Sequence, residues 1–204
     1  MRSATNKRGF TLVETLTVIG IVVVLMGLVF PATGRIIAES RSTRCLSNLK
    51  QQFAAIESFR QMHNNLLPHC EPLPVVGPDG PTGGLNATLN GYIDPQSSVW
   101  ICPEDNDPDS YETGTSYLYL PGLYVLSPQV QLQLPPTAYT MPEKERKDLE
   151  ARLVTVFYET EGAASIPLVL DSQDRHHIGS RDPRNGLHMD GSARIVSIEV
   201  ETGD

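Results

Sequence analysis

The sequence lacks the short motifs that mark most catalytic centres. It contains no Gly-x-Ser-x-Gly nucleophile turn, no His-Glu-x-x-His zinc motif and no glycine-rich phosphate loop. Isolated acids and histidines do not replace these motifs, because catalysis needs a nucleophile, a base and an oxyanion donor placed together. No internal repeat is present either. These absences favour a structural or binding protein over an enzyme such as a membrane-anchored hydrolase.

Basic residues are also fewer than acidic residues. The 204 residues include 16 Lys and Arg against 24 Asp and Glu, which gives a formal net charge of −8. Nucleic-acid binding requires a basic face for the phosphate backbone, and anionic lipid headgroups likewise attract basic segments. The composition therefore disfavours nucleic-acid binding, DNA uptake included, and broad contact with lipid headgroups.

One long apolar run contrasts with this polar composition. Residues 10–30 are almost entirely apolar, and as a helix with a rise of about 1.5 Å per residue they would span roughly 30 Å of hydrocarbon. Glu14 lies inside the run, where burying a carboxyl group costs about 2.5–3.5 kcal/mol. The carboxyl group of Glu14 therefore needs a partner at membrane depth.

The segment before the run differs from a secretory signal peptide. Residues 1–9 are basic and have no apolar core, whereas a signal peptide is cleaved after its apolar stretch. A cut between Gly9 and Phe10 would free the α-amino group of Phe10 one helical turn from Glu14, and on a neighbouring copy this amine can neutralise the carboxylate. Loss of the three basic leader residues would move the formal charge from −8 to −11.

Residues 9–14, Gly-Phe-Thr-Leu-Val-Glu, resemble the leader junction of the type IV pilin and pseudopilin superfamily. The resemblance implies that a prepilin peptidase cleaves after Gly9 and methylates the exposed Phe10. It also implies that Glu14 assists assembly and that Pro31 kinks the helix. The resemblance covers about the first fifty residues. The alternative is an uncleaved signal anchor that carries a glutamate by chance.

The resemblance and the patterns together predict an α+β, pilin-like fold, in which a long N-terminal helix packs on a C-terminal antiparallel β-sheet. We expect a leader at residues 1–9, a transmembrane helix at 10–30, the periplasmic half of a stalk helix at 31–62 and a globular domain at 63–204. The basic leader should stay in the cytoplasm, which places the domain in the periplasm.

Local patterns predict the elements of the domain. A stripe of apolar residues steps by three or four positions and indicates a helix that ends near Met62: Leu46, Leu49, Phe53, Ile56 and Phe59. Residues 63–99 are rich in turn-forming Pro, Gly and Asn. We expect strands at 116–120, 123–126, 153–158, 167–170 and 193–200, a polar loop at 127–142 and a short charged helix at 143–152.

The C-terminal part is similar to a group of pilin-like proteins associated with prepilin processing. The matching positions are, in chain order, Cys102-Pro103, Ser116-Tyr117, Arg175-His176, Gly179, Asn185, Leu187 and Asp190-Gly191. Thirteen residues separate His176 from Asp190 where nine are usual in the group, so the loop geometry does not carry over. Asp190-Gly191 is also a turn pair that would join two strands as a hairpin.

Several major pseudopilins bind calcium through a C-terminal loop, and this resemblance suggests a calcium site. Four carboxylates can supply oxygen ligands: Asp171, Asp174, Asp182 and Asp190. Their spacing is not that of an EF-hand. A zinc site at the nearby histidines is disfavoured, because they lack a spacing that fixes a metal. We expect no other cofactor.

The chain has three cysteines, Cys45, Cys70 and Cys102. In an oxidising periplasm they allow one disulfide and leave one thiol. A bond between Cys70 and Cys102 would close the loop region, and it is the pairing we predict. Cys45 lies on the helix, where it is either buried or meets another subunit.

These observations predict a non-enzymatic structural subunit, a pseudopilin of a type II secretion system that assembles into a short periplasmic filament. Its partners would be the prepilin peptidase, other pseudopilins or pilins, the inner-membrane assembly platform and membrane lipid, but not nucleic acid. Before assembly it would be a single-pass inner-membrane protein. The alternatives are a minor type IV pilin and a membrane-tethered adhesive or binding module.

Overall fold

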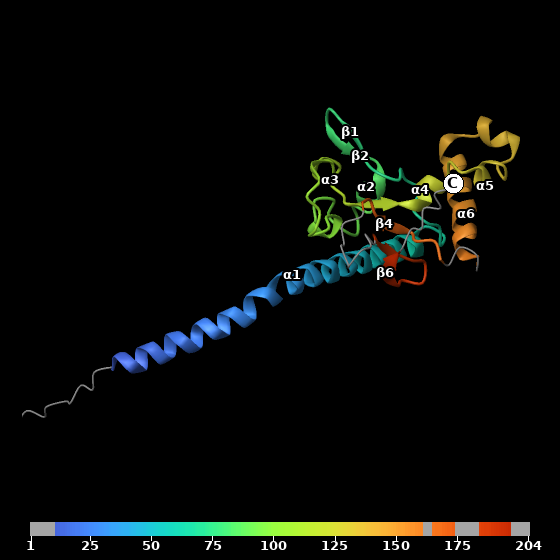
Figure 1. Ribbon diagram of the computed structural model, residues 1–204. Coiled ribbons are helices and arrows are strands. Elements are labelled where there is room, and N and C mark those ends of the chain that lie inside the picture. Colours follow the sequence, from blue (N-terminus) through green and yellow to red (C-terminus); the bar gives the residue numbers. More distant parts are fainter. Residues whose placement is uncertain (1–10, 161–164, 174–183, 197–204) are drawn as a thin grey trace, which may run out of the picture. The chain divides into compact units, whose positions relative to one another are not determined.

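The computed structural model describes residues 11–160, 165–173 and 184–196, except for the side chains of residues 28–35 and 38. The chain divides into two compact units, Met1–Ser40 and Arg41–Asp204. The first unit contains the beginning of a long helix. The second contains the end of that helix and the globular domain, drawn from teal to red in Figure 1.

Helix α1, Leu12–Met62, is the long helix, with 51 residues that include Pro31. It ends where the sequence predicts. The N–H groups of His63 and Asn65 both donate to the carbonyl oxygen of Arg60, and Asn64 and Asn65 have φ angles of 54° and 64°. Asparagine tolerates this left-handed conformation better than most residues, so the two asparagines end the helix.

In the second unit, α1 buries one face against the domain. Cys45, Leu49 and Ile56 are fully buried, and Phe53 and Phe59 are half-buried beside them. These positions recur every three or four residues, as the apolar stripe predicts. Each large apolar side chain buried in this way contributes roughly 1.5–3 kcal/mol to the stability of the domain.

Four short strands form an antiparallel sheet in the order β3-β4-β5-β6. They are β3 Tyr117–Tyr119, β4 Val169–Asp171, β5 Arg184–Leu187 and β6 Ala193–Val196. Tyr117 pairs with Asp171, and Val169 pairs with Leu187. The helix and this sheet confirm the predicted α+β architecture of a pilin-like fold.

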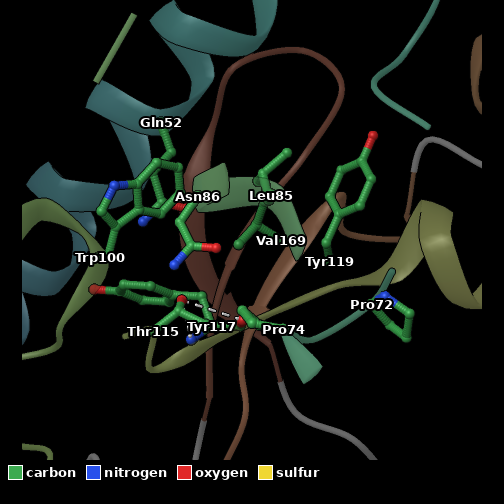
Figure 2. Close-up of a pocket in the computed structure, with 10 residues that line it drawn as sticks. All are labelled: Gln52, Pro72, Pro74, Leu85, Asn86, Trp100, Thr115, Tyr117, Tyr119 and Val169. Carbon is green, nitrogen blue, oxygen red and sulfur yellow. Dashed lines mark hydrogen bonds between the residues drawn. The ribbon is translucent and has the colours of Figure 1, made fainter. Parts of the chain in front are cut away.

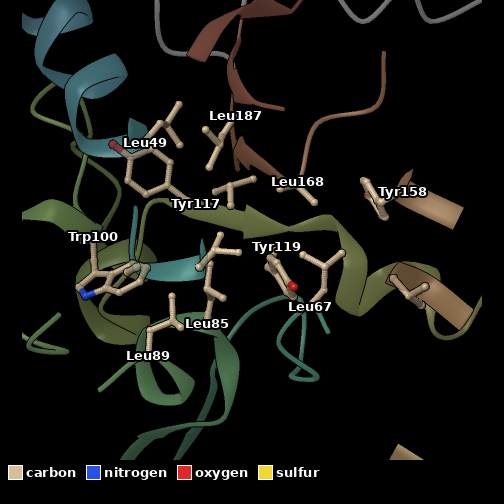
Figure 3. Packing of buried hydrophobic residues seen from close by; sticks show 14 of the residues in the cluster. Leu49, Leu67, Leu85, Leu89, Trp100, Tyr117, Tyr119, Tyr158, Leu168 and Leu187 are labelled. Carbon is tan, nitrogen blue, oxygen red and sulfur yellow. The ribbon is translucent and has the colours of Figure 1, made fainter. Parts of the chain in front are cut away.

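The hydrophobic core lies between α1 and the sheet. Figure 3 shows Leu49 of α1 beside Tyr117 of β3 and Leu187 of β5, all of them buried. Trp100 is 1% exposed and satisfies its ring N–H by donating to the carbonyl oxygen of Asp94 at 3.0 Å. The core therefore draws on segments far apart in the chain.

The other elements within the described residues are mostly short. They are the hairpin β1 Val75–Gly77 and β2 Gly80–Thr82, then α2 Gly84–Thr88, η1 Ser98–Trp100, α3 Pro108–Thr113, α4 Leu120–Tyr124, α5 Pro128–Gln131, η2 Pro136–Thr140 and α6 Glu143–Glu159.

The strand predicted at residues 123–126 is wrong, because helix α4 ends with Leu123 and Tyr124 and the next two residues form a turn. Pro121 stands in the first turn of α4, where its missing N–H costs nothing. Gly122 follows, and a Cβ atom there would lie 2.4 Å from the carbonyl oxygen of Cys70. Close backbone packing thus requires glycine at this position of α4. The polar loop predicted at 127–142 contains α5 and η2.

The strand predicted at residues 153–158 is also wrong, because the charged helix predicted at 143–152 continues through it as α6. The apolar residues of this run follow the helical period as well as the β-period. Thr155 accepts the N–H of Leu67 at 2.9 Å, and the Tyr158 hydroxyl donates to the carbonyl oxygen of Pro167 at 3.2 Å. These tertiary contacts override the β-propensity of the run.

Candidate functional site

The candidate site lies at the start of α1. Gly9 and Phe10, the predicted cleavage and methylation positions, lie outside the described residues. Thr11 and Glu14 are described, and they form reciprocal hydrogen bonds. The N–H and the hydroxyl of Thr11 both donate to Oε2 of Glu14 at 2.9 Å, and the N–H of Glu14 donates to Oγ1 of Thr11 at 3.3 Å.

This arrangement is a capping box, in which the residue before a helix and the third residue of the helix satisfy each other's free N–H groups. Glu14 therefore has a partner within its own chain. The sequence analysis missed this pairing, although Thr-x-x-Glu before an apolar run is its usual signature. The capping box holds the carboxylate of Glu14 beside Thr11. Thr11 directly follows Phe10, whose α-amino group cleavage would free.

Behind the capping box, α1 presents an apolar surface. The described large apolar side chains of its first turns are exposed, with Leu12 at 81% and Leu16 at 68%. Within the described residues, no helix is both long enough and apolar enough to cross a membrane. The predicted span at residues 10–30 extends beyond the described side chains at both ends.

Comparison with protein families finds a match at the start of the chain. The family described as prokaryotic N-terminal methylation motif matches residues 4–30. Over these residues the chain carries the N-terminal methylation motif that type IV pilin-like proteins share. The motif implies processing by a prepilin peptidase and a membrane-anchored N-terminal helix, and pilin-like proteins are typically structural rather than enzymatic. No curated protein and no solved structure matches the chain.

The disulfide predicted for this pilin-like protein is wrong. The bond joins Cys45 and Cys102, with a Cα–Cα distance of 5.2 Å, and Cys70 is a free thiol. Side chains of α1 hold the segment before Cys102 in place: Nδ2 of Asn48 donates to the carbonyl oxygen of Ile101 at 3.1 Å, and Nε2 of Gln52 donates to that of Val99 at 3.0 Å. Cys102 is thereby fixed against α1.

Two of the pairs that match the prepilin-processing-associated group lie together. The N–H of Cys102 donates to Oγ of Ser116 at 2.9 Å, and the N–H of Ser116 donates to the carbonyl oxygen of Trp100 at 2.8 Å. Arg175, His176 and Gly179 lie outside the described residues. The shared Cys-Pro and Ser-Tyr elements therefore serve to join a loop to the edge strand β3.

Asp190 and Gly191 form the turn between β5 and β6, as predicted. Oδ1 of Asp190 accepts the N–H of Ser192 at 2.8 Å, and the N–H of Gly191 donates to the carbonyl oxygen of His188 at 3.0 Å. Gly191 has a φ angle of 78°, and a Cβ atom there would lie 2.7 Å from the ring of Phe53 on α1. The turn thus packs directly on the helix.

The predicted calcium ligands are described only in part, because Asp174 and Asp182 lie outside the described residues. Asp171 is fully buried, and its Oδ2 accepts the N–H of Asn185 at 2.9 Å. The strand register sets Asp171 opposite Asn185, whereas Asp190 lies beyond the other end of β5. Among the described residues, no group of three or more His, Cys, Asp and Glu is placed to hold a metal ion.

A small cavity in the domain is too small for a substrate. Gln52, Trp100 and Tyr117 are among its lining residues in Figure 2, and its volume of ≈ 10 Å³ leaves room for about one water molecule. A cavity of this size fits a packing defect or a structural water rather than a catalytic pocket.

A larger cleft of ≈ 560 Å³ lies between residues 69–71 and α6. At its base, Oε2 of Glu150 lies 2.8 Å from Nε2 of His69, and its Oε1 accepts a hydrogen bond from Arg146 at 3.1 Å. Desolvation raises the pKa of the Cys70 thiol, which also lines the cleft, to about 12. A thiol with this pKa stays protonated and is a poor nucleophile. The described residues of this cleft therefore favour a structural role.

Proposed function

We propose that this pilin-like protein is a structural subunit, a pseudopilin, of a periplasmic filament like that of type II secretion systems. The observation that carries the proposal is the pairing of Thr11 with Glu14 at the start of an exposed apolar helix, inside the matched motif. A membrane anchor alone needs no carboxylate in this position, whereas a subunit that joins to other copies can use one.

Cleavage between Gly9 and Phe10 would leave a methylated, cationic amine next to Thr11. Both bonds from Thr11 end on Oε2 of Glu14, so Oε1 is available to the amine of a neighbouring copy. Opposite charges placed together in hydrocarbon lower the cost of burying each of them. Pro31 would let the helices bend as they pack, because it removes one backbone donor from α1.

The topology of the subunit follows from its leader. The basic leader would remain in the cytoplasm until a prepilin peptidase removes it, and the domain would lie in the periplasm. The exposed apolar start of α1 would contact membrane lipid before assembly and other pseudopilins or pilins in the filament. The inner-membrane assembly platform would move the subunit from one environment to the other.

Substituting Glu14 by alanine tests the proposal. Glu14→Ala should leave membrane insertion intact, because it removes a polar group from an apolar helix, but should lower incorporation into filaments by about tenfold or more through loss of the charge pair. Immunoblots of the membrane fraction and of the sheared filament fraction measure the two steps separately.

Glu14→Gln is the matched control for charge. Its amide oxygen can still accept the N–H of Thr11, but it cannot neutralise an amine. We expect it to fail in assembly as Glu14→Ala does. Normal incorporation of either variant would show that the carboxylate is not needed, and the proposed role of Glu14 would have to be abandoned.

One observation favours a second candidate, a minor pilin or a membrane-tethered adhesive or binding module. Large apolar side chains are exposed between α4 and α6, with Leu126 at 71%, Leu132 at 85% and Tyr139 at 68%. Exposed apolar groups in one region often mark a binding surface. Counting subunits in isolated filaments separates the two: a structural subunit should be abundant and should polymerise alone, whereas a tip adhesin should occur in few copies.

We also propose that the C-terminal region binds calcium, with Asp171 among the ligands. Oδ1 of Asn185, next to Asp171, is buried and has no hydrogen-bond partner among the described residues, which suits an added oxygen ligand. A chelator should then lower the melting temperature of the protein by about 5 °C or more, and Asp171→Asn should remove this response. An unchanged melting temperature would exclude the site.

A further inference from the structure

Charge is unevenly distributed along the chain. Between Arg60 and Lys144 there are nine Asp and Glu residues and no Lys or Arg. Five of the nine carboxylates fall within residues 104–112, which we call the acidic loop. The second half of α1 has the opposite character, with several basic residues. Such a separation of charge within one chain creates two surfaces that can attract each other.

Two basic residues in the second half of α1 lie on its exposed face. Arg44 and Lys50 are exposed, while Cys45 and Leu49, next to them in sequence, are fully buried against the domain. The exposed side chains along this face are small or polar and include no acid: Arg44, Ser47, Lys50, Gln51, Ala54, Ser58 and Gln61. Neither Arg44 nor Lys50 forms an ion pair with any described residue. We call this surface the basic face.

The acidic loop is an ordered surface of the domain. Oδ1 of Asp107 accepts the N–H of Asp109 at the start of α3, and Oδ1 of Asp105 accepts the N–H of Asp107 at 2.9 Å. These bonds fix the backbone and leave Asp109 and Glu112 exposed, without an ion pair among the described residues. Asp109 and Glu112 therefore offer two exposed carboxylates to an external cation.

Within one chain, no ion pair among the described residues joins Arg44 or Lys50 to the acidic loop. The acidic loop directly follows Cys102, and the bond from Cys102 to Cys45 ties it to the buried side of α1. Figure 1 shows α3 on the domain, and Arg44 and Lys50 remain exposed on α1. The cations of one chain are therefore available to the acids of another copy.

We infer that the basic face of α1 docks on the acidic loop of a second copy of this chain, with Arg44 and Lys50 opposite Asp109 and Glu112. The inference rests on the proposed filament function and names the surfaces that join its subunits. The two surfaces differ, so the contact is heterologous, and a heterologous contact that does not close on itself builds a helical filament. The charges set the register between copies, since a shift would place like charges together.

Zero-length carbodiimide coupling of the full-length protein in membranes tests the contact. It links the ε-amine of Lys50 to a carboxylate in ion-pair contact, so wild-type protein should give dimers in which a Lys50 peptide is joined to an Asp109 or Glu112 peptide. Reversing the charges in R44E/K50E, or in D109K/E112K, should lower the yield of dimers about tenfold or more. Combining both reversals restores attraction and should restore the dimers.

The double variant K144E/R152E is the matched control. It makes the same change in net charge as R44E/K50E at two exposed positions of α6, outside the basic face, and should leave the dimers unchanged. Melting temperatures of all variants should stay close to that of the wild type, because surface substitutions usually change stability by less than about 0.5 kcal/mol.

The outcomes separate the two proposals. Dimers that persist in R44E/K50E, or that fail to return when both surfaces are reversed, would overturn the assigned contact while leaving the filament function intact. Wild-type protein that gives no dimer under conditions of assembly would overturn the contact, and the filament function would fall as well only if the sheared filament fraction also lacked the protein. Loss of R44E/K50E from the membrane with unchanged dimers would assign the basic face to lipid headgroups and would also overturn the contact.

Discussion

Cys45→Ser is expected to lower the free energy of unfolding by about 4 kcal/mol. The bond between Cys45 and Cys102 closes a loop with a sequence separation of 57 residues, and a cross-link over a loop of this length removes about 4 kcal/mol of chain entropy from the unfolded state. Most single domains are stable by only 5–15 kcal/mol, so the loss is a large fraction of the total. Denaturant unfolding of the full-length protein in detergent measures it.

Cys70→Ser provides the matched control, because Cys70 is free. It should unfold close to wild type under oxidising conditions. A reducing agent should destabilise both wild type and Cys70→Ser and should have little effect on Cys45→Ser. If Cys70→Ser instead loses stability while Cys45→Ser does not, the bond joins Cys70 after all and the pairing described here is wrong.

Gly9→Val is expected to block removal of the leader. The peptidase must accommodate the residue before the cut, and the resemblance places glycine there, so a branched side chain should prevent cleavage. The protein would then keep residues 1–9, with no free amine at Phe10. Incorporation into filaments should fall at least as far as in Glu14→Ala. Both variants lose the same charge pair: Gly9→Val lacks the amine, and Glu14→Ala lacks the carboxylate.

Mass spectrometry of the N-terminus measures this result directly. Wild-type protein should begin at Phe10 and carry a methyl group on its amine, whereas Gly9→Val should begin in the leader. A short, processed form in Gly9→Val would contradict the assigned cleavage position. A wild-type protein that retains residues 1–9 would contradict processing itself.

The helical part of the fold could be predicted from the sequence because its signals are local. The stripe from Leu46 to Phe59 repeats at the period of a helix, and the two asparagines after Met62 end it. The turn at Asp190 and Gly191 is equally local. For the site, the run of Gly9, Phe10 and Glu14 was enough to identify the motif that the family comparison matches.

The predictions that failed depended on contacts between distant segments. Residues 153–158 are suited to a strand, yet contacts with residues 67 and 167 hold them in a helix. The disulfide was assigned to Cys70 because that bond would close the loop region, whereas Asn48 and Gln52 bring residues 99–102 to α1 from about fifty positions away. The capping box is a different case. Its Thr-x-x-Glu signature is present in the sequence, but it was not interpreted as a hydrogen-bonded pair.

The bond between Cys45 and Cys102 also has a mechanical consequence. If the proposed filament function holds, a subunit drawn out of the bilayer would be loaded through its helix, and the hydrogen bonds between α1 and the domain would share that load. The covalent link adds an attachment that cannot slip, near the end of the helix segment that enters the domain. A force applied to α1 would thus be transmitted to the domain through the disulfide, and α1 would not separate from the domain.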